Sequence, residues 1–195
     1  MLALCVSFAE YRGAYSRIGC TTVATFRIWQ DCTQMTQLLY FDDLSVGDRW
    51  TSQGRTITET DVVNFAGVTG DYNPLHVDHE FAERSAFGKP IAHGLLGISL
   101  VAGLGSHSPA VATRAFVGIE AWLFALPLYV GDTVRVRSQI EALNVRSRRT
   151  GQVGWQRELI NQDDAVVQRG TFTTLVLRAA SGANLPSPAW GVKAA

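Results

Sequence analysis

Hydrophobic and polar residues follow two different spacings along the chain, first helical and then strand-like. Thr58, with Asp61 three residues later, has the pattern of a helix start, and apolar residues recur at helical spacing over 62–69 until Gly70. A second short helix is expected over 78–86, because it opens on an aspartate that can cap it and is followed by a glycine and a proline.

The segment 93–105, HGLLGISLVAGLG, is apolar on every side. In a globular protein this pattern indicates a helix that is surrounded by other elements rather than one that lies on a surface. We therefore expect 93–105 to be the central helix of the fold.

After Ala115 the spacing changes to an alternation of period two, which is typical of strands. Four such runs follow one another, and they cover 115–132, 133–145, 151–161 and 165–178. Consecutive strands joined by short turns form an antiparallel meander. With the helical first half, this predicts an α+β fold in which an antiparallel sheet wraps around one buried helix.

The first 34 residues differ from the rest, because they hold all three cysteines and show no sustained spacing. We expect one domain over 35–180, preceded by an extension over 1–34 and followed by a loose tail over 181–195. Two interpretations of the extension stay open. Either Met35 is the natural start of the protein, or the extension packs on the domain without a part in its chemistry.

Composition excludes several classes of function. Hydrophobic residues make up 47% of the chain, and Lys plus Arg equal Asp plus Glu at 17 each, so the excess positive charge typical of nucleic-acid binding is absent. The longest apolar run, 91–105, is shorter than the roughly 20 residues of a membrane-spanning helix. The cysteines have no zinc-binding or disulfide-framework spacing. We expect a soluble, cytoplasmic protein with no nucleic-acid or membrane partner.

All four histidines lie between His76 and His107, close to Asp71 and Asp78. They lack the HExxH spacing of a helical zinc site, so we expect no metal. Ser99 lies in GISLV rather than in a GxSxG elbow, and GLGSHS does not match the GxGxxG nucleotide fingerprint. Neither nucleophilic catalysis nor dinucleotide binding is therefore predicted.

The stretch GDYNPLH, residues 70–76, carries the strongest candidate chemistry. Gly70 lets the chain leave the preceding helix, and Asn73-Pro74 is expected to follow a non-helical path that brings Asp71 and His76 to one side. A carboxylate beside an imidazole can activate a water molecule and return its proton. The alternative is a turn whose polar groups only satisfy each other.

A second candidate is the start of the central helix at His93-Gly94. Helix starts offer unpaired N–H groups and a positive dipole end, and Gly94 has no side chain to obstruct a ligand. Such donors can stabilise an enolate-like oxygen as charge develops on a thioester carbonyl. The alternative is that His93 only caps or packs at the helix start.

Residues 65–96, FAGVTGDYNPLHVDHEFAERSAFGKPIAHGLL, resemble the signature of the MaoC-like dehydratases, the hot-dog-fold family that includes (R)-specific enoyl-CoA hydratases. The resemblance extends from about Tyr40 to Leu177, with YFDDLSVGDRW similar to the family's opening and LPLYVGDTVRV similar to its strand after the central helix.

The resemblance implies a helix wrapped by an antiparallel sheet, usually in a homodimer. It also implies addition or removal of water at the α,β double bond of an acyl thioester of coenzyme A or acyl carrier protein, without metal or redox cofactor. Carried over by motif, Asp71 and His76 are the catalytic dyad. Gly94 with His93 forms the oxyanion and substrate-binding site, and Asn73 holds the loop.

Some features depart from the family or stay ambiguous. Several hydratases carry a serine where this chain has Ala102, which puts acyl-chain preference in doubt. Lys89 and the arginines of 146–149 either meet the phosphates of coenzyme A or lie in solvent, with a solvated hairpin tip preferred for the arginines. A hot-dog thioesterase and a non-catalytic thioester-binding subunit are the alternative functions. Thioesterases typically lack this Asp-Asn-Pro-His loop, which counts against the first, and the intact dyad counts against the second.

Overall fold

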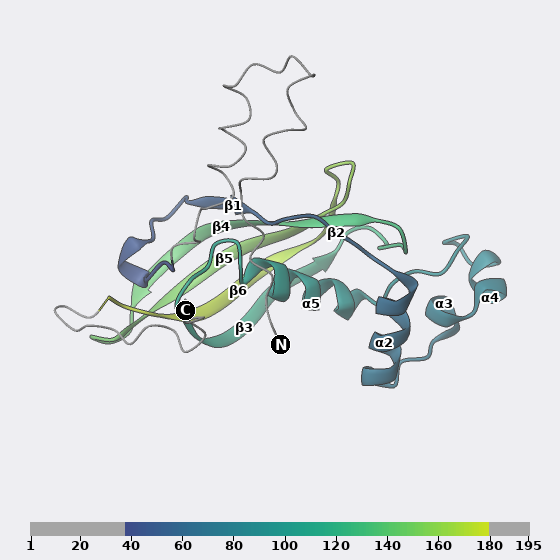
Figure 1. Cartoon of the computed structure of the whole chain (residues 1–195), viewed down its shortest axis with the longest axis horizontal. Coiled ribbons are helices and arrows are strands. Elements are labelled where there is room, and N and C mark those ends of the chain that lie inside the picture. The colour runs from purple at the N-terminus through teal and green to yellow at the C-terminus, as the bar shows by residue number, and fades with distance from the viewer. Residues whose placement is uncertain (1–37, 180–195) are drawn as a thin grey trace, which may run out of the picture. The chain divides into compact units, whose positions relative to one another are not determined.

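The computed structural model describes residues 38–179 (Figure 1). The extension expected over 1–34 and the tail expected over 181–195 lie outside the described residues. The helices are η3 (Phe41–Asp43), α2 (Glu59–Thr69), α3 (Pro74–Val77), α4 (His79–Glu83) and α5 (Gly94–Gly105). The strands are β1 (Arg49–Thr51), β2 (Arg55–Thr56), β3 (Thr113–Phe124), β4 (Thr133–Val145), β5 (Thr150–Ile160) and β6 (Val166–Leu177).

The strands form one antiparallel sheet in the order β1-β4-β5-β6-β3, with β2 also paired to β4. The predicted meander is the run β4-β5-β6, in which Gln156 of β5 lies opposite Gln139 of β4 and Thr171 of β6. β3 pairs with β6 and forms one edge of the sheet. The alternating residues of β4, β5 and β6 bury one face, as their spacing predicted.

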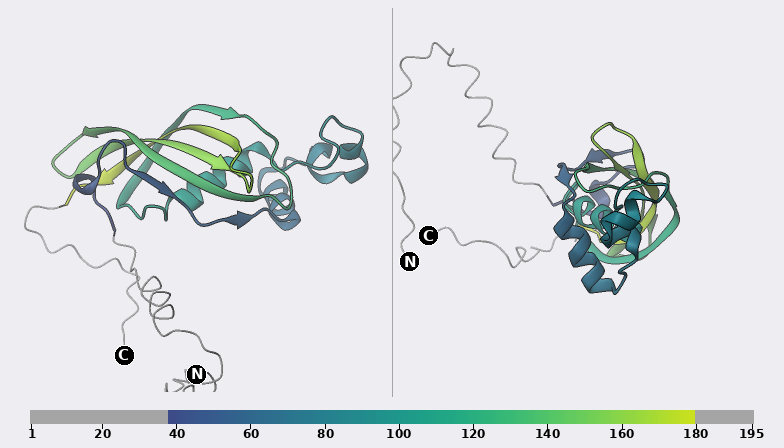
Figure 2. Two further views of the ribbon diagram at one scale, coloured as in Figure 1. Left: turned by 90° about the horizontal axis from the view of Figure 1, so that it is seen from above. Right: turned by 90° about the vertical axis from the view of Figure 1, so that its right-hand side faces the viewer.

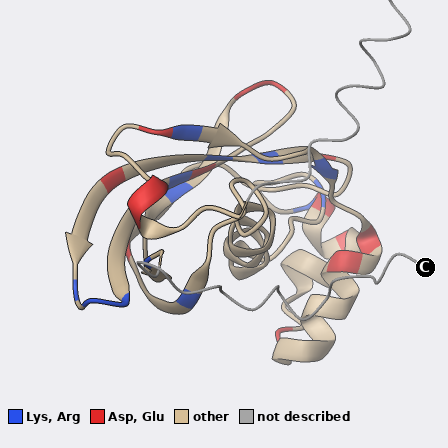
Figure 3. Ribbon diagram, turned by 60° about the vertical axis from the view of Figure 1, so that its left-hand side comes forward, with Lys and Arg blue, Asp and Glu red and all other residues tan. Residues whose placement is uncertain are grey.

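The buried face of the sheet curves around α5, which carries no charged residue (Figures 2 and 3). Leu100 and Val101 of α5 pack in one core cluster with Ile140, Trp155 and Phe172 of the sheet. The predicted α+β fold with a central helix is therefore confirmed. The short helices α2, α3 and α4 lie together beyond the first turn of α5, at one end of the sheet (Figure 1).

Two predicted boundaries were wrong. The strand expected over 115–132 ends at Phe124, because the next two N–H groups both bond to the carbonyl of Val167 and Pro127 then removes a donor. The helix expected over 78–86 ends at Glu83, where the Ser85 hydroxyl bonds to a carbonyl of the last turn.

The segment around Asn73-Pro74 is helical, contrary to the prediction. Pro74 cannot continue α2, but it is well suited to the first position of a new helix, where no N–H is needed. The Asn73 side chain caps this helix by accepting from the Leu75 N–H at 3.0 Å. The single turn of α3 therefore replaces the expected non-helical loop.

The central helix is not buried on every side within one chain. Leu95 is 60% exposed, and Ser99 and Gly103, one and two turns further along, are exposed on the same stripe. Ser99 donates its hydroxyl proton to the Leu95 carbonyl of its own helix and is exposed, so the packing role expected for it is not seen within one chain.

Candidate active site

The sequence between α2 and α3 sets the position of Asp71. Thr58 and Asp61 form a capping box that starts α2, and Gly70 ends it in the left-handed conformation at φ 76°. Asp71 follows directly, and its Oδ1 accepts from the Asn73 N–H at 3.3 Å. Its side chain is 53% exposed. Asp71 and the capped turn of α3 therefore lie on one short connection.

His76 lies on α3 with its imidazole largely buried. Its Nδ1 is 2.7 Å from the carbonyl oxygen of Ile91. A carbonyl can only accept, so Nδ1 carries the proton, and in the neutral ring Nε2 holds a free lone pair. That Nε2 lies 4.0 Å from Oδ2 of Asp71. The two side chains of the predicted dyad are thus brought together.

His93 lies behind this pair and is 2% exposed. Its Nε2 donates to the backbone carbonyl of Asp71 at 2.9 Å and lies 4.0 Å from the Asp71 carboxylate. The His93 and His76 rings are stacked, with centroids 3.9 Å apart at 33°. His93 makes no side-chain cap to α5, so the capping role considered for it is absent.

Gly94 is the first residue of α5, where backbone N–H groups have no intrahelical partner and the helix dipole is positive. The ring of Phe124 packs against it so closely that a Cβ at this position would lie 2.9 Å from a ring carbon. A glycine is therefore required for this approach of α5 to β3.

A cavity of about 350 Å³ opens at Gly94. Its wall is mainly apolar and includes His76, Phe124 and Gln168. Asp71 is not among the residues that line this cavity, and its carboxylate lies 4.0 Å from Nε2 of His76, which does line it. A second cavity of about 300 Å³ is lined by Glu59, His79 and Lys89, among others. His76 lines both cavities.

The same cluster has the spacing of a metal site, since one ligating atom each from Asp71, His76 and His93 lies within 4.8 Å of the others. The hydrogen bonds argue against this use. The His93 Nε2 donates to a carbonyl, so it carries a proton and lacks the lone pair that a metal requires. The cluster fits proton transfer better than metal binding.

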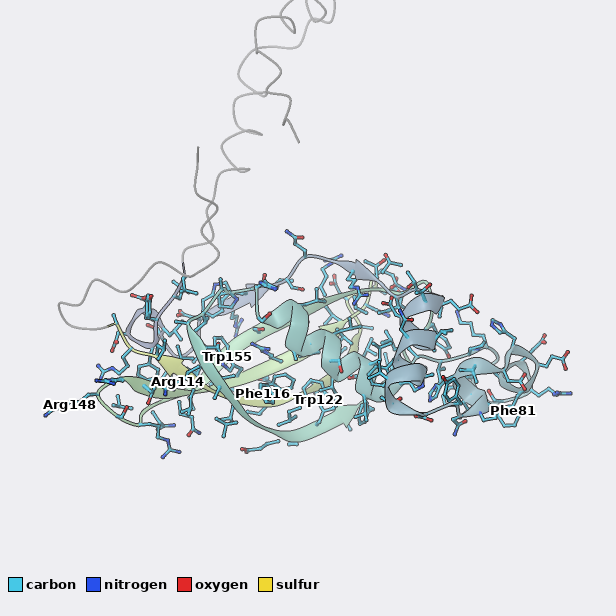
Figure 4. All side chains as sticks on the ribbon, turned by 60° about the horizontal axis from the view of Figure 1, so that its bottom comes forward. Phe81, Arg114, Phe116, Trp122, Arg148 and Trp155 are labelled. Carbon is cyan, nitrogen blue, oxygen red and sulfur yellow. The ribbon has the colours of Figure 1, made fainter. Side chains whose placement is uncertain are left out.

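The basic residues considered for coenzyme A phosphates lie in different places. Lys89 lines the second cavity, with its ammonium 4.3 Å from the ring centroid of Tyr129. Arg148 lies in the turn between β4 and β5, at the opposite end of the sheet from Phe81 of α4 (Figure 4). Within one chain the structure brings Lys89, and not Arg148, near His76.

One residue of the site was missed by sequence reasoning. Gln168 of β6 is 2% exposed, lines the first cavity and donates to the Gly94 carbonyl at 3.1 Å. A signal was present, because period-two spacing from Phe172 and Val176 places Gln168 on the inward face. A polar residue at an inward position indicates a specific partner.

Residues 46–161 match the family model described as MaoC like domain. The chain is 39% identical over 115 residues to a 3-hydroxybutyryl-CoA dehydratase of Methylorubrum extorquens, a match that covers 58% of this chain and 71% of that protein. It is 36% identical over 111 residues to Protein MaoC of Klebsiella aerogenes, covering 57% of this chain and 33% of that protein. The chain thus spans about a third of the latter relative.

Solved structures agree with the sequence match. A monoamine oxidase regulatory protein from Archaeoglobus aligns with a TM-score of 0.69 at 32% identity, covering 74% of this chain and 99% of that chain. A Mycobacterium tuberculosis protein with a double hot-dog fold aligns with a TM-score of 0.68 at 21% identity, covering 78% of this chain and 52% of that chain, which shows the fold alone.

A sheet curved around a central helix is the architecture of the hot-dog class. Within that class, this chain belongs to the MaoC-like dehydratase family, as its GDYNPLH and FGKPIAHG stretches predicted. Within residues 38–179, none of the helices is long and apolar enough to cross a membrane.

Proposed function

We propose that this protein catalyses the reversible addition of water to the α,β double bond of a trans-2-enoyl thioester carried on coenzyme A or acyl carrier protein. The observation that carries the proposal is the convergence of Asp71 and His76 beside the start of α5. The printed activities of the relatives, among them the 3-hydroxybutyryl-CoA dehydratase and (R)-specific enoyl-CoA hydratases, support the same reaction.

In this proposal one water molecule lies between Asp71 and His76. The 4.0 Å between the carboxylate oxygen and Nε2 is too long for a direct hydrogen bond and leaves both groups free to hold the same water. As the water oxygen attacks the β-carbon, the dyad takes one of its protons and delivers a proton to the α-carbon. The proposal assigns the transferred proton to the dyad rather than to either residue.

The thioester carbonyl lies in the first cavity, with its oxygen at the Gly94 N–H. Negative charge develops on this oxygen when the nucleophile adds, and the free N–H and the dipole of α5 stabilise it. The mainly apolar wall excludes water and strengthens this interaction. Gly94 is therefore the oxyanion donor in the proposed mechanism.

His93 and Asn73 act as positioning residues. His93 is buried behind His76, where it holds the Asp71 backbone and stacks on the catalytic ring. Asn73 caps the turn that carries His76. The resemblance implied substrate binding for His93 and a loop-holding role for Asn73, and the contacts of both residues favour a supporting role. With acid–base groups and an oxyanion donor in place, the reaction requires no metal or redox cofactor.

The two alternative functions are less well supported. A non-catalytic thioester-binding subunit has no need for a carboxylate and an imidazole held at this spacing. Thioesterases typically lack the Asp-Asn-Pro-His loop that this chain carries. We keep hydration and dehydration as the proposed reaction.

We further propose that the protein forms a homodimer through β3. This strand is the edge of the sheet, and its exposed apolar side chains include Phe116, Val117 and Leu123 at 52%, 55% and 48% exposure. A long apolar edge strand that stays open to solvent promotes association with another strand. A second copy paired at this edge would also lie beside the first cavity, which Phe124 lines.

The proposed reaction is tested by mixing the purified protein with trans-2-enoyl-CoAs of short and medium chain length. Loss of the conjugated absorbance is followed, and the stereochemistry of the product is determined. We expect hydration of at least one substrate, at a rate that prior treatment with EDTA leaves unchanged. No hydration across the panel would overturn the proposed reaction, and a rate abolished by EDTA and restored by a metal would overturn the metal-free mechanism.

A further inference from the structure

Gln168 is a buried polar residue in the apolar core at the start of α5. Its Nε2 donates to the Gly94 carbonyl at 3.1 Å, and its Oε1 accepts from the indole N–H of Trp122 at 3.2 Å. Trp122 comes from the edge strand β3, beside α5 (Figure 4). Burying an amide costs free energy unless its hydrogen bonds are made, and an apolar residue would fill the same space without that cost.

The first turn of α5 is shaped around this amide. Gly97 faces Gln168 so closely that a Cβ on Gly97 would lie 2.2 Å from Nε2 and 2.7 Å from Oε1. The amide therefore lies flat against the helix, and only glycine at position 97 permits this. Gly94 is thus held on one side by the Gln168 amide and on another by the Phe124 ring.

We propose that Gln168 is a positioning residue that sets the place of the Gly94 N–H. Gly94 has no side chain of its own to anchor it, and it lies at the end of a helix, where the backbone is least constrained. A donor that stabilises a developing charge must be held within a fraction of an ångström. The two hydrogen bonds that link Trp122 to Gln168 and Gln168 to the Gly94 carbonyl supply that constraint. The inference rests on the proposed function, because Gly94 matters only if it binds the oxyanion.

The competing explanation is that Gln168 only stabilises the fold. A matched control on the same strand shows what the loss of a buried polar side chain does to stability alone. Thr174, 5% exposed on the same face of β6, accepts from the indole N–H of Trp155 at 2.9 Å, and no bond joins it to Gly94. Both residues are thus buried acceptors of a tryptophan N–H, and only Gln168 also holds the start of α5.

The experiment compares Gln168→Met, which keeps the side-chain length and removes the amide, with Thr174→Val. Hydration of the best enoyl-CoA is measured for kcat and KM, and the melting temperature is measured for each variant. We expect Gln168→Met to lower kcat by about tenfold to a hundredfold while KM changes less than about threefold, because the loss falls on a donor used in the transition state. Thr174→Val should lose comparable stability and keep kcat within about twofold.

A kcat within about threefold of the wild type in Gln168→Met, or an equal fall in kcat in Thr174→Val, would overturn the inference. If Gln168→Met does not fold, Trp122→Phe takes its place, since it removes the N–H that orients the amide.

Amide hydrogen exchange separates this test from the proposed function. If the wild type hydrates no enoyl-CoA, the proposed function fails. The hydrogen bond from Gln168 to the Gly94 carbonyl is then tested by the rate of amide hydrogen exchange in the peptide covering 93–101. Faster amide exchange in this peptide in the Gln168 variant than in Thr174→Val supports a positioning role of Gln168 at the start of α5, and equal exchange refutes that role.

Discussion

His76 and His93 are stacked imidazoles held in opposite tautomers by two backbone carbonyls. His76 donates from Nδ1 to Ile91, whereas His93 donates from Nε2 to Asp71. The difference is the reason that the proposal assigns the proton transfer to His76, because only His76 directs an unprotonated nitrogen toward the Asp71 carboxylate. The buried ring behind it fixes the backbone from which that carboxylate extends.

The Asn73 cap on α3, the helical turn that carries His76, leads to a prediction about a single residue. Asn73→Ala removes the acceptor of the Leu75 N–H and should cost about 1 kcal/mol of stability. Because α3 carries His76, we also expect kcat to fall by about tenfold. Asp78→Ala is the matched control, since Asp78 caps the neighbouring α4 through the Phe81 N–H at 3.0 Å. Equal activity in the two variants, measured by enoyl-CoA hydration with melting curves, would contradict the role of Asn73.

The sequence could indicate the site at the level of residue types but not its hydrogen bonds. Asp71, His76 and Gly94 were chosen from a motif and from the helix start, and the structure brings them together; their catalytic roles stay predictions. The tautomers are set by the backbone carbonyls of Ile91 and Asp71. Every residue has a backbone carbonyl, so the residue types do not reveal these two hydrogen bonds. Gln168 was missed for a related reason, since its partner is a carbonyl on a distant helix.

At the scale of elements, the end of α2 sets where the connection to α3 begins, which is the segment that carries Asp71. Its capping box joins the Thr58 hydroxyl to the Asp61 N–H and the Asp61 carboxylate to the Thr58 N–H, and Arg55 also pairs with that carboxylate. Burial acts to raise the pKa of Asp61, but the hydrogen bonds from Thr58 and the charge of Arg55 outweigh it, so the pKa lies below its ordinary value.

The lowered pKa fixes the sign of a stability prediction. A carboxyl group whose pKa is lower in the folded state contributes stability above its unfolded pKa, and this contribution is lost as the pH falls through the folded value. Asp61→Asn should therefore cost about 1 kcal/mol at neutral pH and progressively less below about pH 4. Urea unfolding at several pH values measures this cost. Glu59→Gln is the control, because Glu59 is in the same turn with a side chain 68% exposed. A loss of stability in Asp61→Asn that does not depend on pH would contradict the lowered pKa of Asp61.

Element types were predicted better than element ends. The capping box, the Gly70 stop and the alternation in β4 to β6 are local patterns, and they appear in the structure as expected. The end of β3 depends on both Ala125 and Leu126 bonding to Val167 of another strand, which no local pattern encodes. The turn of α3 was missed because Pro74 was interpreted as a helix breaker rather than as a first helical residue.

At the scale of the whole molecule, the exposed edge of the sheet is the feature that a single chain leaves unexplained. Val117 of β3 is 55% exposed on the sheet edge, and Leu95 is 60% exposed on the stripe of α5 that the sheet does not cover. Both belong to elements whose patterns predicted burial. A second copy paired at the β3 edge would lie against the side chains of that strand, which is why the dimer is part of the proposed function.

The dimer prediction is tested by light scattering during size-exclusion chromatography. The wild type should elute with twice the chain mass of 21.2 kDa. Val117→Glu places a charge on the edge strand and should shift the protein toward the monomer, since a buried unpaired charge is costly. Val145→Glu, at a valine on β4 that is 62% exposed against 55% for Val117, should stay dimeric. A monomeric wild type would refute the proposed interface.

The dyad is tested most directly by comparing enoyl-CoA hydration by the wild type, Asp71→Asn and His76→Ala in parallel, with His107→Ala as a control outside the site. Both dyad variants should keep the wild-type melting temperature within a few degrees and lose about a thousandfold or more in kcat, because each removes a group that transfers the proton. His107→Ala should keep its rate. A folded Asp71→Asn or His76→Ala protein with a rate within about tenfold of the wild type would contradict the dyad.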